Sequence, residues 1–336
     1  DLAESYFFQA IKIGETNQDS NLVRDTLSSI AGVHRSLGKL DEAKRHYSRA
    51  LELSRLHKDR RSEGNNLSNL GLIYYDEQDY VTATKYIQQG LEIAREIGDK
   101  RGEANRLGHL GNIYNLIGKP EQAITYYSEA VQICRLISHR INEGNWLGNM
   151  GNSYRYLEKF HEAIQLYEQA LTISQEVRSQ KQEIIWYINL GLTHISLQQW
   201  EQAIEFLGKA VDASEELGDY RSFQKAINKL SDLYLQLGEF REAIKCHKKQ
   251  LAASQKIGDL ETSGNLFNVI GLALIHLGVM DEAIIYLEQG LSMSRKLQDK
   301  TLEGSCLINI AIHARHVNEY AKVVDLYDRV IDCYRA

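Results

Sequence analysis

The sequence is poor in proline and cysteine, and both shortages limit the fold classes that the chain can adopt. Its 336 residues include a single proline, although a β-sandwich or barrel needs many turn residues. Ala, Leu, Glu and Gln are abundant instead, which predicts an all-α protein. None of the cysteines belongs to a CxxC pair, which suits a reducing compartment without a disulfide framework. They stand at Cys134, Cys246, Cys306 and Cys333.

Clustered positive charge and long apolar runs are also missing. The 39 basic residues are outnumbered by 45 acidic ones, for a net charge of −6. Nucleic-acid binding needs clustered positive charge, so we expect no nucleic-acid partner. No apolar run approaches the roughly 18 residues of a membrane span, and the first residues lack the basic-then-apolar pattern of a signal peptide. We therefore expect a cytoplasmic protein with no membrane partner.

The sequence does contain a repeat with a step of forty residues. The small residue of this repeat recurs as Ala43, Ala83, Ala123, Ala163, Ala203, Ala243 and Ala283. A second series keeps the same step as Leu51, Leu91, Val131, Leu171, Val211, Leu251, Leu291 and Ile331. A register that persists over eight copies without an insertion indicates a stack of identical units.

Each unit predicts two helices. In one copy the apolar spacing predicts a first helix from Gly102 to Ile117 and a second from about Glu121 to Ile137. Pro120 stands at the second helix's start, where its missing N–H costs nothing. Several second helices are expected to end at a capping glycine, namely Gly98, Gly218 and Gly258.

The unit resembles the tetratricopeptide repeat (TPR). The family pattern appears as Leu107, Leu110, Gly111, Tyr114, Ala123, Tyr127 and Ala130, and again as Leu147, Met150, Gly151, Tyr154, Ala163, Tyr167 and Ala170. The forty-residue period exceeds the family's usual 34, as in the long-helix subclass of Pins/LGN adaptors, kinesin light chains and bacterial signalling proteins. The resemblance implies a right-handed superhelical solenoid of antiparallel helix pairs that binds proteins.

The expected organisation is one TPR solenoid over residues 1–336. Residues 1–17 are predicted to be a second helix without its partner, because Ala3 falls in the phase of Ala43. The repeats follow at about 21–60, 61–100, 101–140, 141–180, 181–220, 221–260, 261–300 and 301–336. An uncapped start suggests that the chain is a piece of a longer polypeptide with further domains.

A search for catalytic motifs finds none. The sequence has no GxSxG, no HExxH and no phosphate-binding loop after a strand, so we expect neither an enzyme nor a cofactor. The nearest metal pattern is Cys306, His313 and His316 on one first helix, but zinc would want a fourth ligand. We interpret these residues as a buried cysteine and two helix histidines, and predict no metal site.

Asparagine is distributed unevenly. Eighteen Asn occur; most lie in predicted first helices, and none lies in the second helix of any of the eight repeats. One phase holds Asn65, Asn105, Asn145 and Asn265, and the phase four residues later holds Asn69, His109, Asn149, Asn189 and Asn309. Asn112 and Asn152 follow three residues after that. Offsets of zero, four and seven fall on one helix stripe, which in the TPR family lines the concave groove.

Two interpretations of the amides stay open. They could bracket the N–H and C=O groups of an extended peptide, or they could form a structural ladder by bonding to each other or to backbone; both can hold together. The residues predicted to bind a peptide are Asn65, Asn69, Asn105, His109, Asn112, Asn145, Asn149, Asn152, Arg155, Asn189, Lys225 and Lys229.

A carboxylate clamp of some co-chaperone TPR domains is a further hypothesis. Four of its five positions carry suitable residues, Asn152, Asn189, Lys225 and Lys229. The fifth, normally lysine, is Gly148, and Asp232 follows Lys229 closely enough to pair with it.

We therefore predict a scaffold that binds a protein or peptide in an Asn-lined concave groove. The alternative is a ligand-sensing or autoinhibitory TPR module of a larger signalling protein.

Overall fold

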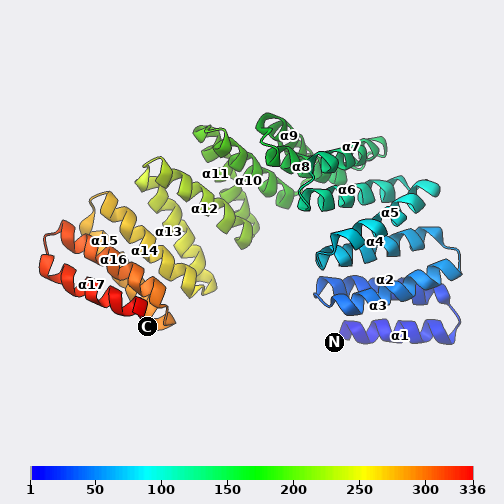
Figure 1. Cartoon of the computed structure of the whole chain (residues 1–336), viewed down its shortest axis with the longest axis horizontal. Coiled ribbons are helices and arrows are strands. Elements are labelled where there is room, and N and C mark those ends of the chain that lie inside the picture. The colour runs from blue at the N-terminus through cyan, green and yellow to red at the C-terminus, as the bar shows by residue number, and fades with distance from the viewer. Residues whose placement is uncertain (1, 336) are drawn as a thin grey trace. The chain divides into compact units, whose positions relative to one another are not determined.

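A computed structural model describes residues 2–335, and in that range the chain is helical with no strand. Successive helices are separated by turns of two or three residues (Figure 1). The helices are α1 (Leu2–Thr16), α2 (Ser20–Ser36), α3 (Leu40–Leu56), α4 (Arg60–Asp76), α5 (Tyr80–Glu96), α6 (Lys100–Leu116), α7 (Pro120–Leu136), α8 (Arg140–Tyr156), α9 (Phe160–Glu176), α10 (Gln180–Ser196), α11 (Trp200–Leu217), α12 (Tyr220–Gln236), α13 (Phe240–Ile257), α14 (Leu260–His276), α15 (Met280–Leu297), α16 (Lys300–His316) and α17 (Tyr320–Arg335).

Capping residues set the helix ends. Asp99 accepts a hydrogen bond from the backbone N–H of Gly102 at 3.0 Å, so α6 begins at Lys100, two residues before the predicted start. The predicted capping glycines are confirmed, because each lies in the left-handed region that glycine adopts without strain. Their φ angles are 68° at Gly98, 71° at Gly218 and 75° at Gly258. The predicted leading helix lies at Leu2–Thr16, with Asn17 in the turn and residue 1 outside the described range.

The small signature residues bring paired helices close together. A Cβ atom on Gly71 of α4 would lie 2.6 Å from Cγ1 of Ile87 on α5. Ile87 and Ala83 are both fully buried, so the space that Gly71 leaves is filled by its partner helix. Glycine and alanine at these positions thus let the helices of one pair approach each other closely.

The contacts divide the chain into two compact units, one up to Gln182 and one from Glu183. In the first unit, helices α1 to α9 each pack on their sequence neighbours, and the first helix α6 also contacts the first helices α4 and α8. In the second unit, α11 to α17 pack in the same sequential way, and α14 contacts α16. The first helices α4, α6 and α8 therefore lie side by side in the first unit, as α14 and α16 do in the second.

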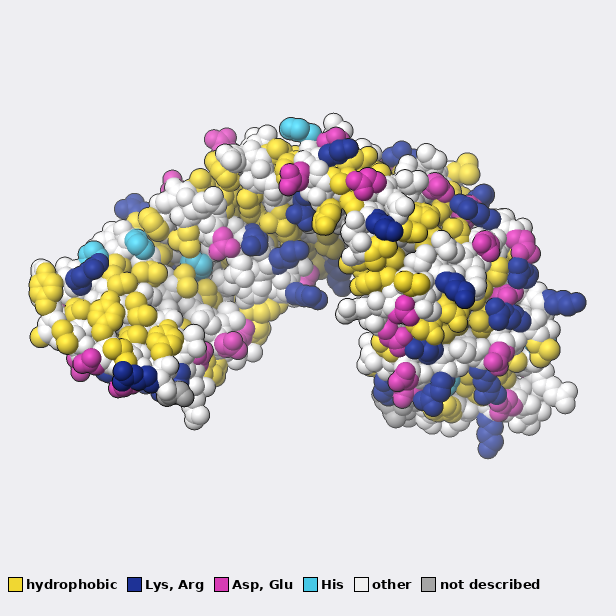
Figure 2. Space-filling model, viewed as in Figure 1, with side chains coloured by type: hydrophobic (Ala, Val, Ile, Leu, Met, Phe, Trp, Pro, Cys, Tyr) yellow, Lys and Arg dark blue, Asp and Glu magenta, His cyan; other side chains and the backbone are white. Residues whose placement is uncertain are grey.

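A recurring ion-pair arrangement joins a second helix to the next first helix at four places in the described chain. In the first unit, Glu103 on α6 accepts a hydrogen bond from Arg95 on α5 at 2.9 Å and another from Lys100 at 2.8 Å. Three further glutamates form the same two bonds, namely Glu63, Glu143 and Glu303. Figure 2 shows acidic and basic side chains interspersed over the visible face of the first unit, with no large area of one sign.

Within residues 2–335, no helix combines the length and the hydropathy that crossing a bilayer requires.

Candidate functional site

The absence of asparagine from the second helices is confirmed for residues 2–335. Sixteen of the eighteen Asn lie in the even-numbered helices α2 to α16, and the other two, Asn17 and Asn318, lie in turns. Because α6 contacts both α4 and α8, the amides of these three helices share one face of the first unit. That face carries the site built below.

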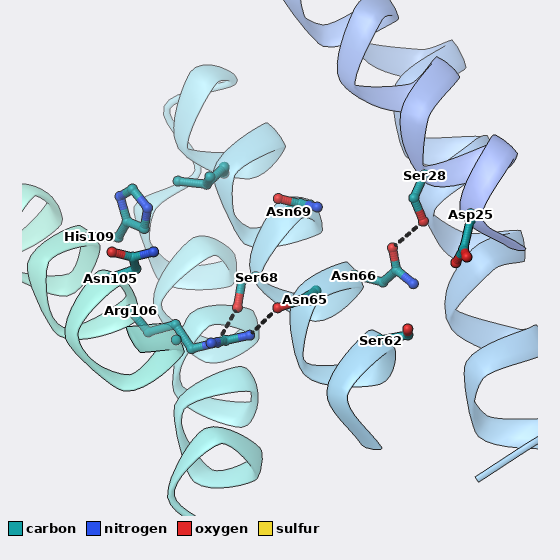
Figure 3. Close-up of a pocket in the computed structure, with 12 residues that line it drawn as sticks. Asp25, Ser28, Ser62, Asn65, Asn66, Ser68, Asn69, Asn105, Arg106 and His109 are labelled. Atoms are coloured by element: carbon teal, nitrogen blue, oxygen red, sulfur yellow. Dashed lines mark hydrogen bonds between the residues drawn. The ribbon is translucent and has the colours of Figure 1, made fainter. Parts of the chain in front are cut away.

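A polar pocket of about 380 Å³ opens where α2, α4 and α6 meet (Figure 3). We call it the polar pocket; its lining is Asp25, Ser28, Ser62, Asn65, Asn66, Ser68, Asn69, Leu72, Gly102, Asn105, Arg106 and His109. A second cavity of about 210 Å³ shares Leu72 and His109 with it and adds Arg35, Tyr75 and Asn112. The two cavities together bring five of the predicted binding residues to one place, namely Asn65, Asn69, Asn105, His109 and Asn112.

Arg106 was not among the predicted binding residues, yet it forms part of the pocket wall. It reaches from α6 toward α4, where Nε donates to Ser68 Oγ at 2.7 Å and Nη2 donates to Asn65 Oδ1 at 3.0 Å (Figure 3). The residue is only 4% exposed. Burial lowers the pKa of Arg106, and Asp99 opposes this through space. The forty-residue repeat did not indicate a binding residue at position 106, because the equivalent positions in the next two repeats are Trp146 and Trp186.

His109 stands between the two cavities. Burial lowers the pKa of His109 to about 4, with smaller contributions from the positive charges of Arg35 and Arg106. The imidazole is therefore neutral at neutral pH, with one nitrogen able to donate and the other able to accept. Its ring meets Trp146 edge-on at a centroid distance of 5.9 Å.

Part of the amide stripe is a structural ladder. Asn142 donates to Asn105 Oδ1 at 2.5 Å, and Asn149 donates to Asn112 Oδ1 at 3.1 Å, both between successive first helices. Asn112 Oδ1 also accepts from the hydroxyl of Tyr127 at 2.6 Å. In the second unit, Asn309 donates to Asn268 in the same way at 2.9 Å.

Other amides of the stripe take no part in these amide–amide hydrogen bonds. Asn69 and Asn145 are half-buried on α4 and α8, and neither makes a hydrogen bond within the part of the chain that the structure describes. Asn65 is exposed and uses its oxygen for Arg106. The ladder and a ligand role can therefore coexist, and the ligand role stays a prediction.

The remaining predicted residues divide between the units. In the first, Asn152 accepts from the hydroxyl of Tyr167 at 2.7 Å, and burial raises the pKa of Tyr167 to about 12 against a smaller opposing influence of Arg155. In the second, Asn189 is buried and Lys225 is exposed. Lys229 lies 3.7 Å from Asp232, so the pairing expected from their spacing is present.

The possible metal pattern is not gathered into a site. Cys306 is fully buried and His316 is exposed, while Nε2 of His313 lies 3.0 Å from the backbone oxygen of Met280. Among residues 2–335, no three His, Cys, Asp or Glu side chains come together as metal ligands would.

A known family model matches most of this chain. The family model described as tetratricopeptide repeat matches residues 22–96, 62–136, 142–216, 182–256 and 222–296. No curated protein matches the chain by sequence.

Three solved structures are similar at low identity. The STAND protein with a tetratricopeptide repeat sensor from Pyrococcus horikoshii is 15% identical with a TM-score of 0.65, over 98% of this chain and 49% of that one. The apo form of the quorum sensor NprR from B. thuringiensis is 14% identical with a TM-score of 0.56, over 99% and 100%. A Rap protein complexed with competence and sporulation factor is 14% identical with a TM-score of 0.51, over 98% and 96%. At these low identities, the three structures show a similarity of fold.

Proposed function

The chain belongs to the tetratricopeptide repeat family, and on that basis we propose that it is a protein-interaction scaffold whose first-helix face in the first unit binds an extended peptide or partner segment. The observation that carries the proposal is the polar pocket, where neutral amides of α4 and α6 converge around a space of about 380 Å³ that α2 closes with Asp25 and Ser28. Each amide offers two donors and an acceptor, which match the N–H and C=O groups of an extended backbone. We assign binding rather than catalysis.

The amides that make no internal hydrogen bond are the ones we propose to contact the ligand. Asn69 lies in the polar pocket and Asn145 lies on α8 beyond it, and both are half-buried without a hydrogen-bond partner in residues 2–335. Neither amide is used inside the described fold, so both can hydrogen-bond to the backbone of a bound segment. Asn105 and Asn112 hold their neighbours in place through the ladder.

The solved relatives are consistent with a bound peptide or partner. One is a Rap protein in complex with competence and sporulation factor, and another is a quorum sensor. Their similarity to this chain is one of fold, so they support the class of function and leave the ligand open.

A sensor module of a larger signalling protein is a second candidate. The observation that favours it is the STAND protein, in which a match to 98% of this chain covers 49% of the relative. In that case ligand binding to the repeats would release or activate another part of a longer chain.

The test compares two pairs of amides. The double variant Asn69→Ala and Asn145→Ala is used as bait beside the unchanged chain in a pull-down from the source cells, with captured proteins quantified by mass spectrometry. The matched control is Gln122→Ala with Gln132→Ala, two exposed amides on the second helix α7. We expect the Asn variant to lose specific partners that the Gln variant retains. Equal capture by all three baits would contradict the proposal.

A further inference from the structure

A cavity of about 360 Å³ opens at the edge of the second unit where the second helices α11 and α13 end. We call it the edge cavity. Seven of its ten lining residues belong to these two helices, and none is among the residues predicted to bind a peptide. The residues that matter below are Glu215, Tyr220, Phe223, Lys249, Ala253 and Lys256.

In the first unit, the equivalent place in the repeat is closed by an ion pair. Arg60 at the start of α4 pairs with Glu96 at the end of α5. Arg140 of α8 pairs with Glu176 of α9 in the same way. Beside the first of these pairs, the second helix contributes a large apolar side chain, Ile93, which is buried. An ion pair and an isoleucine thus occupy the space that is open in the second unit.

Five positions of the repeat change together at the edge cavity. Two charged positions become aromatic, two change the sign of their charge, and one loses its isoleucine. Glu215 replaces Arg55, Arg95 and Arg135; Tyr220 replaces Arg60, Lys100 and Arg140; Phe223 replaces Glu63, Glu103 and Glu143; Ala253 replaces Ile93, Ile133 and Ile173; and Lys256 replaces Glu96 and Glu176. The ion pair that would cross the space and the side chain that would fill it are therefore both replaced.

The walls of the edge cavity are largely aromatic and apolar. Phe223 is buried, and its ring lies beside that of Tyr220 with a centroid distance of 6.4 Å. Ala253 continues the apolar wall on α13. Ligand pockets of proteins typically enclose about 300–1,000 Å³ and combine such walls with a few polar groups. The edge cavity has both the size and the lining of a small-molecule site.

The rim of the edge cavity offers one cation that no internal carboxylate holds. Lys249 lies 2.8 Å from Glu215 and 3.1 Å from Asp212, so its charge is compensated. Lys256 is exposed and forms no ion pair within residues 2–335, because Tyr220 stands where an arginine would meet a glutamate. An anionic group at the mouth can pair with Lys256 without displacing an internal partner.

We propose that the edge cavity binds a small amphipathic anion. Its aromatic or aliphatic body packs against Tyr220, Phe223 and Ala253, and its carboxylate pairs with Lys256. The apolar body supplies most of the affinity, since removal of apolar surface from water drives such binding. An exposed ion pair adds little, so the carboxylate selects an anion over a neutral molecule of the same shape by about two- to fivefold.

The experiment titrates the full chain with a fluorescent probe and matched competitors. Anilinonaphthalene sulfonate, an aromatic anion, reports binding by its fluorescence. Naphthoate and naphthalenemethanol compete as an anion and a neutral molecule with the same aromatic body. Decanoate and decanol make the same comparison for an aliphatic body, so the stronger pair identifies the kind of body that the cavity takes.

Three variants alter the edge cavity in different ways. Ala253→Ile restores the isoleucine of other repeats and fills the space. The double variant Tyr220→Arg with Lys256→Glu restores the ion pair that crosses it, and Lys256→Gln removes only the cation. The controls are Lys245→Gln, an exposed lysine on the same helix, and Ala321→Ile, an exposed alanine on α17.

We expect one saturable probe site on the unchanged chain and on both controls. Ala253→Ile and the double variant should each weaken probe binding by about tenfold or more, because the space is filled or crossed. Lys256→Gln should keep its affinity for naphthalenemethanol and lose the preference for naphthoate. Thermal unfolding shows whether each variant is folded. A poorly folded Ala253→Ile is replaced by Ala252→Leu, which narrows the mouth at an exposed position.

Several results would overturn this inference. Probe binding that persists in Ala253→Ile or in the double variant would place the probe elsewhere. Equal competition by the anion and the neutral molecule, or a preference for naphthoate that survives in Lys256→Gln, would remove the role of the cation. Absence of saturable binding would remove the site. The proposed peptide site in the first unit is unaffected by any of these results, because its test changes Asn69 and Asn145.

Discussion

At the scale of single residues, chemically identical side chains have different roles on the same helix face. Asn112 Oδ1 accepts hydrogen bonds from Asn149 and from Tyr127, whose side chain is 1% exposed. Asn69 makes no hydrogen bond in the described chain and faces the polar pocket. The first amide holds helices together, and the second remains available for a ligand.

This difference predicts opposite effects on stability. Asn112→Ala strands the buried hydroxyl of Tyr127, which should cost about 1–3 kcal/mol and lower the melting temperature by several degrees. Asn69→Ala removes no internal bond and introduces a better helix former, so its melting temperature should stay equal or rise. Thermal unfolding of both variants checks this. A lower melting temperature for Asn69→Ala than for Asn112→Ala would reverse the assignment of ladder and ligand amides.

At the scale of helix pairs, small residues and ion pairs fix how neighbouring helices meet. A Cβ atom on Gly111 of α6 would lie 2.6 Å from Cε1 of Tyr127 on α7. Gly208 is also inside a helix, but a Cβ atom there would have no neighbour within 4 Å. These two glycines separate the effect of helix packing from that of helix propensity.

The packing prediction concerns the sign of two matched changes. Gly208→Ala should stabilise the protein by roughly 0.5–1 kcal/mol, because alanine is the better helix former and meets nothing. Gly111→Ala gains the same propensity but overpacks against a buried ring, which costs about 1–3 kcal/mol, so it should be destabilising. The denaturation midpoints of the two variants should move in opposite directions. Movement of both midpoints upward would show that α6 and α7 separate easily.

The ion pairs predict how stability depends on pH. Lys300 donates a hydrogen bond to Glu303 and holds the pKa of that carboxyl below its ordinary value of 4.5, with a smaller effect in the same direction from Arg295 and an opposing one from burial. A pKa that is lower in the folded state stabilises the fold above the ordinary value. That contribution disappears as the pH falls through the folded value.

Glu303→Gln should therefore be less stable than the unchanged chain at pH 7, and the difference should shrink below pH 4.5. Melting temperatures of both proteins measured from pH 7 to pH 3 give the comparison. A difference that stays constant over this range would mean that the ionised carboxylate contributes nothing specific.

At the scale of the whole molecule, the proposed peptide site belongs to one of the two units. Every residue that lines the polar pocket lies between Asp25 and His109, and α1 to α9 pack on their sequence neighbours within that unit. The stability of repeat proteins is approximately a sum of repeat and nearest-neighbour contributions. We therefore expect the first unit to fold on its own with the polar pocket intact.

A fragment of residues 1–179, which ends before α10, should remain helical by circular dichroism. Because the polar pocket is intact in it, the fragment should retain the partner capture of the full chain within a few-fold, although it unfolds at a lower temperature. The complementary fragment 180–336 serves as the control and should lack that capture. Capture found only with the complementary fragment would place the peptide site in the second unit.

The sequence by itself determined the repeating architecture and the polarity of one face. A forty-residue step in Ala43, Ala83 and their successors was enough to place two helices per unit, because burial of one apolar face repeats with the chain. The bias of asparagine toward first helices was also visible, since helix propensity treats first and second helices alike. The position of helix starts was predicted less well. The observed start of α6 lies two residues before the predicted one, because the capping residue Asp99 sets where the helix begins and the apolar pattern does not show it.

Only the tertiary structure decided which polar groups meet. Arg106 finds Ser68 and Asn65 at separations of 38 and 41 residues, and the space it fills depends on Gly90 and Gly102 on two different helices. The repeat phase assigns Arg106 to a buried position that holds tryptophan in α8 and α10, and it says nothing about a charge there. Likewise, the spacing of Asn69 and Asn112 is that of one stripe, but the acceptor that each amide faces is set by the approach of neighbouring helices. Periodicity in a sequence fixes the direction of a side chain, whereas its partner depends on how closely two helices pack.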